Sequence, residues 1–263
     1  MKNPLIDWYL YTAPQPGIGG RAPLYTSGKT FGGGSARNFL NYQRYVIVHS
    51  LNLSIASIQH SLLNFLHRSS VGAFQKWADE VGDQSYTFDN LLPFFKKSVH
   101  FTPPTASTTP SNVSLPYEAN YFSSDGGPLQ VSFPGYFNAI SSWIGNAFDE
   151  LGFKRLPAFS DGRLFGWSYF TYTVDPTSQT RSSSETSFLR AALRETTNLN
   201  FYKSTQVKKI LLDNCKTATG VLVNTAGVEY TIAASKEVIL SAGSVSHSTL
   251  FRQNPFYFPR DAC

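Results

Sequence analysis

Three consecutive glycines followed by a serine mark the part of this chain best suited to hold a ligand. They occupy positions 32 to 35 within Ser27 to Asn38, which reads SGKTFGGGSARN. Glycines carry no Cβ, so a flat or phosphorylated ligand can approach the main chain, and Ser35 and Asn38 offer directional hydrogen bonds. These residue types favour a nucleotide-like ligand, while an ordinary glycine loop without a ligand stays the alternative.

Two neighbouring glycine patterns fail as phosphate-binding motifs. The Gly-Lys-Thr at 28 to 30 imitates a Walker A loop, which needs a glycine five residues before its Gly-Lys. That position is Pro23, which has no N–H to offer a phosphate. The segment from Gly17 to Ala22 fits a dinucleotide fingerprint, which must leave a strand and open a helix, but prolines flank it on both sides. Neither pattern predicts a nucleotide site.

Two helices are predicted between residues 71 and 99, after the glycine segment. Apolar residues of Val71–Val81 share one helical face, and Gly82 ends the run. The stretch FDNLLPFFKKS at 88 to 98 predicts the second helix, although proline is tolerated only near the first turn of a helix. Residues 102 to 128 are rich in Pro, Ser and Thr and predict a loop. We expect Trp77, on the first of these helices, to lie in the core.

Two further helices are predicted later in the chain. The apolar stripe of Asn138–Leu151, ended by Gly152, is the clearest helical pattern, and we expect its Trp143 to be a core residue. The run SSSE predicts another helix start, in which Ser182 caps the backbone and Glu185, three residues on, reaches back as in a capping box.

The last third of the chain changes to strand patterns. Four β-type runs follow one another between turn residues, at 199 to 213, 218 to 225, 228 to 234 and 236 to 243. Their adjacency predicts an antiparallel meander followed by one fully buried strand, Val238–Leu240. The fold class is therefore mixed α/β (α+β), and 263 residues suffice for one large domain or two small ones.

Composition excludes several classes of function. The net charge is +5, but the basic residues are scattered as pairs, whereas a nucleic-acid groove needs a concentrated basic face, so we expect no nucleic-acid partner. Two cysteines and five histidines without ligand spacing predict neither a disulfide framework nor a metal site. The first residues carry no signal-peptide pattern. The sequence leaves the compartment and the oligomeric state open, and secretion of a full-length form is compatible with it.

Several blocks of the chain, in order, resemble the glucose-methanol-choline (GMC) oxidoreductases, in the fungal branch of aryl-alcohol oxidases and choline dehydrogenases. The blocks are GRAPLYTSGKTFGGGSARNFLNYQR (20 to 44), GAFQKWADEVGDQSYTFDNLLPFFKKS (72 to 98), RSSSETSFLRAAL (181 to 193), LNFYKSTQVKKILLD (199 to 213), ATGV (218 to 221) and KEVILSAGSV (236 to 245). Ordered agreement over several blocks is far more specific than any single motif. The resemblance implies an FAD-dependent oxidoreductase that acts on the CH–OH group of a small-molecule alcohol.

The resemblance also implies which residues bind FAD. In the family the glycine-serine turn and the following asparagine lie along the flavin and its pyrophosphate, the next two residues supply adjacent main chain, and a later strand contacts the adenine end through its backbone. The implied positions are Gly32, Gly33, Ser35, Asn38, Phe39, Leu40 and Val207. Two residues depart from the family pattern, since Phe39 replaces a glycine of many relatives and Arg37 replaces an aliphatic residue.

The same resemblance implies an incomplete FAD-binding domain of the GMC type with part of the substrate domain. The FAD-binding parts would be about 1–44, 69–134 and 176–263, and the substrate side about 135–175. Family members carry a true dinucleotide fingerprint upstream and a catalytic histidine far downstream, and no residue here matches either. We therefore expect a chain truncated at both ends, without a catalytic residue and inactive alone. The alternative is a non-catalytic interaction chain, a pseudoenzyme fragment without bound flavin.

Residues 45–68 interrupt the match, and we interpret them as an insert translated from an intron. The stretch is uncharged from Tyr45 to Leu66, but its His, Asn, Gln and Ser residues make a membrane span unfavourable. Arg44-Tyr45-Val46 can be encoded as CGG TAT GTG, which contains the fungal donor sequence GTATGT, and His67-Arg68 can contain an acceptor AG. A lineage-specific loop insertion is the alternative.

The intron interpretation predicts two transcript lengths. Amplifying the spliced message across codons 44 to 69 should give a product that lacks the insert and restores the family spacing. A genomic template supplies the unspliced length as the control. If every message retains the segment, the loop insertion is correct instead.

Overall fold

The computed structural model describes residues 3–43, 66–67, 70–123, 125–157, 159–163, 165–243, 245–246 and 250. Contacts divide the chain into two compact units, Met1–Thr196 and Thr197–Cys263. Most of the proposed insert, 45–65 and 68, lies outside the described residues. The two described residues within it, Leu66–His67, form the short strand β4.

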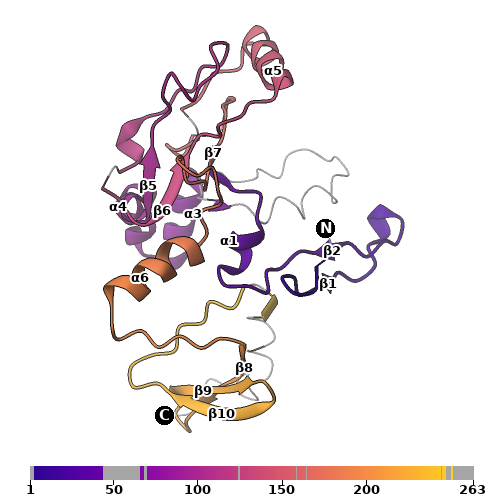
Figure 1. Ribbon diagram of the computed structural model, residues 1–263, viewed down its shortest axis with the longest axis vertical. Coiled ribbons are helices and arrows are strands. Elements are labelled where there is room, and N and C mark those ends of the chain that lie inside the picture. The colour runs from indigo at the N-terminus through magenta and orange to yellow at the C-terminus, as the bar shows by residue number, and fades with distance from the viewer. Residues whose placement is uncertain are drawn as a thin grey trace. The chain divides into compact units, whose positions relative to one another are not determined.

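The first unit begins with a hairpin and a short helix (Figure 1). Strands β1 (Leu10–Tyr11) and β2 (Leu24–Tyr25) pair antiparallel, and a 3₁₀ turn, Pro16–Ile18, lies between them. The segment from Gly17 to Ala22, which fits a dinucleotide fingerprint in sequence, thus belongs to a turn, as the prolines that flank it indicate. Helix α1 (Gly33–Arg37) follows, at the glycine segment.

A mixed five-stranded sheet forms the centre of the first unit, in the order β4-β3-β7-β6-β5. Its other strands are β3 (Asn41–Gln43), β5 (Val99–Thr102), β6 (Leu129–Ser132) and β7 (Thr171–Tyr172). Buried and partly exposed side chains alternate along β5, as in a strand of a half-buried sheet. The core cluster on this sheet consists of Tyr42, Val99, Phe101, Phe122, Leu129, Val131 and Phe133.

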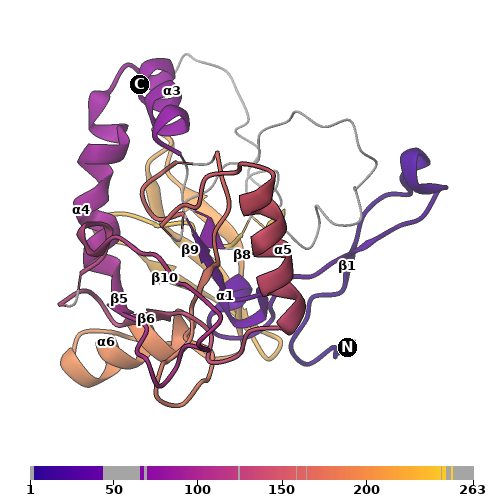
Figure 2. The ribbon, with the colours of Figure 1, turned by 90° about the horizontal axis from the view of Figure 1, so that it is seen from above.

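Helices α3 (Val71–Val81) and α4 (Phe88–Ser98) confirm the two helices predicted between 71 and 99. The Ser70 side chain caps the first by accepting from the Ala73 N–H, and Gly82 ends it with φ 69°. Pro93 lies inside α4 rather than in its first turn, so its missing N–H removes one helical hydrogen bond. The C-terminal end of α4 leads directly into β5 (Figure 2). As predicted, residues 102 to 128 are largely irregular.

Helix α5 (Ala139–Glu150) confirms the third predicted helix and lies apart from α3 and α4 in Figure 1 and Figure 2. The prediction that the tryptophans of these helices are core residues is wrong, because Trp77 is 58% exposed and Trp143 is 74% exposed. The helices are buried at small residues instead. Ala78 is the buried residue of α3 and Gly145 that of α5, where a Cβ on Gly145 would lie 2.6 Å from the Trp167 ring. Close approach at small residues leaves the tryptophans outside the contact.

The predicted capping box is displaced by one residue. Ser183 and Thr186 form it, since the Ser183 N–H donates to Thr186 Oγ1 and the Thr186 N–H donates to Ser183 Oγ. Ser182 Oγ instead accepts from the distant Gln130 N–H, and Glu185 accepts from Arg190 Nε. A π-helical turn, Glu185–Leu189, then leads into α6 (Arg190–Glu195).

The second unit confirms the predicted antiparallel meander. Strands β8 (Thr205–Leu212), β9 (Ala218–Thr225) and β10 (Val228–Ala233) pair in the order β10-β9-β8. The predicted strand Val238–Leu240 is wrong, since these residues form no strand and Ile239 is 78% exposed. The described sheet of this unit consists of β8, β9 and β10, and a strand forms only where a neighbouring strand satisfies its N–H and C=O groups. The fold class, mixed α and β, is confirmed.

Candidate functional site

The glycine segment forms a tight turn at the start of α1. Gly32 precedes the helix with φ 87°, and Gly33 opens it with φ 47°. Both values lie in the left-handed region that glycine adopts without steric cost. The turn ends at Leu40, whose φ is also positive at 69°. We call Gly32 to Leu40 the glycine loop.

One side of the glycine loop is packed and the other is bare. A Cβ added to Gly32 would lie 3.3 Å from Ser183 Oγ. A Cβ added to Gly33 or Gly34 would meet no atom within 4 Å outside its own helix and its chain neighbours. Bare main chain of this kind fits the close approach of a flat ring or a phosphate, as the sequence predicts.

The side chains of Ser35 and Asn38 are used inside the protein. Ser35 Oγ donates to Gly32 O at 2.6 Å and accepts from the Ser184 N–H at 3.0 Å. Asn38 is buried, and its Oδ1 accepts from the Leu40 N–H at 3.1 Å. These bonds shape the loop, so the two residues would act on a ligand through the main chain that they hold.

The next two residues differ in what they leave accessible. The Phe39 side chain is 57% exposed beside the loop. Both main-chain groups of Leu40 are engaged. Its N–H donates to Asn38 Oδ1, and its C=O accepts from the Thr173 N–H at 2.7 Å and from Thr173 Oγ1 at 3.1 Å. Leu40 therefore fastens the loop to the segment after β7.

The arginine that departs from the family pattern anchors α1 to the N-terminal segment. Arg37 Nη2 donates to Asp7 Oδ2 at 3.0 Å, and Asp7 is buried. Asp7 Oδ1 also accepts from the Tyr9 N–H at 2.8 Å. Burying a carboxylate costs free energy unless it is paired and hydrogen-bonded, and Arg37 supplies that partner.

A second arginine reaches the loop from 143 residues away in sequence. Arg181 Nη1 donates to Asn38 Oδ1 at 2.6 Å and to Ser35 O at 3.1 Å. A turn between Asp175 and Thr180 brings it there, since Val174 and Arg181 pair antiparallel. Burial lowers the pKa of Arg181, and the nearby positive charge of Arg37 lowers it further.

Sequence reasoning missed the residues that support the loop. They are Asp7, Arg37, Thr173, Arg181, Ser183 and Ser184. Three of them belong to the run RSSSETS, which the sequence presents as a helix start alone. The density of small hydroxyl residues beside an arginine was the available signal that this run packs against another backbone.

Val207 lies on β8 in the second unit, opposite Val223, where the register shifts before Lys209. The structure thus brings six of the seven predicted FAD-binding residues together in the glycine loop. The seventh is described only within its own unit.

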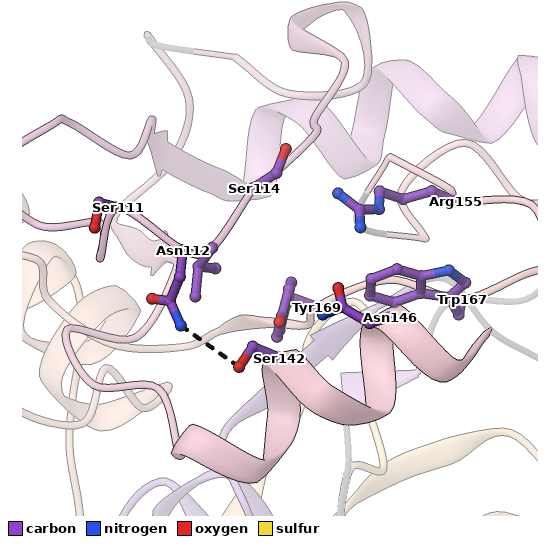
Figure 3. A pocket seen from close by; sticks show the side chains of 9 residues that line it. Ser111, Asn112, Ser114, Ser142, Asn146, Arg155, Trp167 and Tyr169 are labelled. Atoms are coloured by element: carbon purple, nitrogen blue, oxygen red, sulfur yellow. Dashed lines mark hydrogen bonds between the residues drawn. The ribbon is translucent and has the colours of Figure 1, made fainter. Parts of the chain in front are cut away.

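A separate polar cavity of about 210 Å³ lies between α5 and the loop at 111 to 114. Figure 3 shows the two sides facing each other, joined by a hydrogen bond from Asn112 Nδ2 to Ser142 Oγ. The Arg155 guanidinium stacks over the Trp167 ring at 4.3 Å and pairs with Asp149 at 2.8 Å. Its charge is thus already compensated. The lining residues are Ser111, Asn112, Val113, Ser114, Ser142, Asn146, Arg155, Trp167 and Tyr169.

Among the residues that the structure describes, no three His, Cys, Asp or Glu side chains come together as metal ligands would. No helix in the described part of the chain has the length and apolar character needed to cross a bilayer.

Comparison with known proteins identifies the family. Residues 62–256 match the family model described as GMC oxidoreductase. This match covers well over half of the chain, and the chain belongs to the GMC oxidoreductase family. The resemblance predicted from the sequence is therefore confirmed.

Curated relatives are fungal. The chain is 46% identical over 246 residues to versicolorin B synthase stcN of Emericella nidulans, covering 92% of this chain and 35% of the relative. It is 40% identical over 242 residues to patulin synthase of Penicillium expansum, covering 92% of this chain and 34% of the relative. The chain thus spans about one third of the length of these relatives.

Solved structures share the fold. An FAD-dependent oxidoreductase from Chaetomium thermophilum superposes with a TM-score of 0.77 at 24% identity, covering 94% of this chain and 38% of that one. A fungal aryl-alcohol oxidase gives a TM-score of 0.74 at 19% identity, covering 90% of this chain and 36% of that one. The predicted fold, part of a GMC-type FAD-binding oxidoreductase, is confirmed, and the family supports FAD as the cofactor.

Proposed function

We propose that the full-length protein is an FAD-dependent oxidoreductase that acts on the CH–OH group of a small-molecule alcohol. The family match over residues 62–256 is the observation that carries this proposal. The names of the relatives, versicolorin B synthase and patulin synthase, each refer to one small organic molecule, in keeping with a small-molecule substrate. We propose neither a nucleic-acid partner nor a membrane partner.

The glycine loop would hold the cofactor through its main chain. Gly32 forms the turn with its positive φ, Gly33 exposes bare backbone, Ser35 and Asn38 keep that backbone in shape, and Phe39 and Leu40 continue it. Val207 is proposed to meet the adenine end from the second unit's β8. When bound, FAD supplies the two-electron acceptor that oxidation of an alcohol to a carbonyl requires. We assign no catalytic residue in this chain, and we propose that it does not turn over an alcohol alone.

A second candidate is a non-catalytic chain that binds no flavin. The apolar stripe of α5 favours it, because Ile140 is exposed and so are Trp143 and Ile144, one turn further along the helix. Exposed apolar surface of this kind mediates association with other proteins.

Titrating the purified 263-residue chain with FAD separates the two candidates. Flavin bands in the near-ultraviolet and blue that shift on binding support the oxidoreductase, and a colourless chain that aggregates at every FAD concentration supports the interaction chain. We expect weak FAD binding and no turnover. Reading the genomic DNA on both sides of the coding region then gives the longer form, in which alcohol oxidation is measured directly.

Gly33→Asn tests whether FAD lies against the bare side of the loop. Asparagine tolerates positive φ better than other residues with a side chain, so the turn should persist and the melting temperature should fall only slightly. The new side chain would fill the open space, and we expect the FAD dissociation constant to rise about tenfold, a loss of roughly 1.4 kcal/mol. Gly17→Ala, at an exposed glycine without positive φ, is the control. Unchanged FAD binding in Gly33→Asn would place the cofactor elsewhere.

A further inference from the structure

Arg181 links two parts of the glycine loop. Arg181 Nη1 donates to the Ser35 carbonyl oxygen in the middle of α1. It also donates to Oδ1 of Asn38, the residue that follows the helix. The same Asn38 oxygen holds the N–H of Leu40, where φ is positive. The guanidinium thus fixes the end of the loop in a conformation that the chain does not favour by itself.

Arg181 is also held on a rigid support. The Ser182 N–H donates to Thr173 O at 2.9 Å, and Thr173, fully buried, donates to Leu40 O. The Leu40 carbonyl therefore accepts from Thr173, in the segment after β7. The Leu40 N–H donates to the Asn38 oxygen that Arg181 also contacts. Both contacts come from the two arms of the same turn.

The charge of Arg181 is not neutralised by this arrangement. Among the described residues, no carboxylate oxygen lies within 4.0 Å of the Arg181 guanidinium, whereas Arg37 is paired with Asp7. Arginine remains protonated in proteins, so a partly buried positive charge stays beside the glycine loop. An anionic group near the loop would offset the free-energy cost of burying that charge.

We propose that Arg181 is a positioning residue for FAD: it holds the glycine loop in its binding shape, and its positive charge favours a phosphate-bearing cofactor there. The inference rests on the proposed function, since it takes FAD to be the ligand of this loop. It also separates two roles that can be measured independently, one on the backbone and one on the charge.

The experiment compares wild type, Arg181→Gln, Arg181→Lys and Arg190→Gln in the full 263-residue chain. Arg190 is the matched control, because it lies in the same segment, is 61% exposed and pairs with Glu185 at 2.9 Å. Hydrogen exchange of peptides covering residues 30 to 43 reports the loop without any flavin. Titrations with FAD and with riboflavin, which lacks phosphates, report the charge.

We expect Arg181→Gln to speed exchange in the glycine loop and to raise the FAD dissociation constant about tenfold, as the loss of a charged hydrogen bond implies. Riboflavin binding should weaken less than FAD binding. Arg181→Lys keeps the charge and one donor nitrogen, so it should recover part of both effects, and Arg190→Gln should match wild type.

The outcomes distinguish this inference from the proposed function. If the wild-type chain binds no FAD, the proposed cofactor site in the glycine loop fails for this chain, and the inference fails with it as regards FAD, while exchange still decides whether Arg181 holds the loop. If wild type binds FAD and Arg181→Gln binds it equally well, the inference is overturned and the function stands. Unchanged loop exchange in Arg181→Gln overturns the positioning role. Should the glutamine variant fail to fold, Arg181→Lys supplies the same comparisons.

Discussion

Gly126→Ala should destabilise the first unit by about 3 kcal/mol or more, the cost of a steric overlap that neither partner can avoid. A Cβ at this position would overlap the Val99 carbonyl oxygen and lie 2.7 Å from that of Lys96. Both atoms are backbone, so no side chain can rotate away. Gly127 is similarly enclosed, with a Cβ 2.6 Å from Lys97 O. The pair of glycines lets the chain pass against the end of α4.

The consequence reaches the core of the sheet. β6 begins two residues after Gly127 and pairs in parallel with β5, with Leu129 opposite Val99. Any displacement that relieves the overlap separates these strands and exposes the buried Val99 and Val131. The hydrophobic contribution of such side chains is about 1.5–3 kcal/mol each when fully buried.

Thermal unfolding followed by circular dichroism measures this effect. We expect the melting temperature of Gly126→Ala to fall by roughly 6–12 °C, at about 2–4 °C per kcal/mol for a domain of this size. Gly72→Ala is the control, since it lies within α3 with no neighbouring atom in the way of a Cβ, and should stabilise by about 0.5–1 kcal/mol. A Gly126→Ala chain that melts with wild type would show that the close approach is incorrect.

Helices were predictable from the sequence because their signals are local. Ser70 and Gly82 bound α3, while Asn138 and Gly152 bound α5, within a few residues of the apolar stripe. The stripe did not reveal which of its residues are buried. Which helical residues are buried depends on the surface that packs against them. Trp167 packs against Gly145 of α5, and Trp143 stays exposed.

Strands and caps depend on distant partners, so the sequence specified them less well. Val238–Leu240 has the composition of a buried strand, but strand formation requires a neighbour as well as composition. Ser182 has the spacing of a cap, yet its hydroxyl accepts from Gln130, 52 residues away. The capping role passes to Ser183 as a result.

The glycine loop shows both limits in one site. The family resemblance predicts FAD at its glycines and their neighbours, and that assignment stays a prediction. The side chains that hold the loop were not predictable, since Arg181 and Ser184 lie more than 140 residues away from it. A polar residue read alone suggests a contact to a ligand, whereas the structure shows Asn38 bonded within the protein.

Gly28 packs closely against the backbone of the glycine loop. Asp7 and Gly28 pair antiparallel, and the flanking Lys29 N–H donates to Ile6 O at 3.0 Å, so the N-terminal segment fixes Gly28 from one side. On the other side, a Cβ would overlap the carbonyl oxygen of Gly33 and lie 2.6 Å from its carbonyl carbon. The Lys29 side chain, which imitates a phosphate-binding lysine in the sequence, lies over the Trp8 ring at 5.2 Å.

Gly28→Ala should therefore weaken FAD binding and destabilise the N-terminal segment together. To accommodate the methyl group, either Gly33 must move, which changes the bare surface that would meet FAD, or the segment around Asp7 must move, which strains its ion pair with Arg37. We expect the FAD dissociation constant to rise at least about tenfold and the free energy of unfolding to fall by about 2–3 kcal/mol. Gly17→Ala, in the turn of the same hairpin, should change neither quantity. A Gly28→Ala chain that loses stability but titrates with FAD as wild type does would contradict the expected displacement of Gly33 and would place the movement in the segment around Asp7 instead.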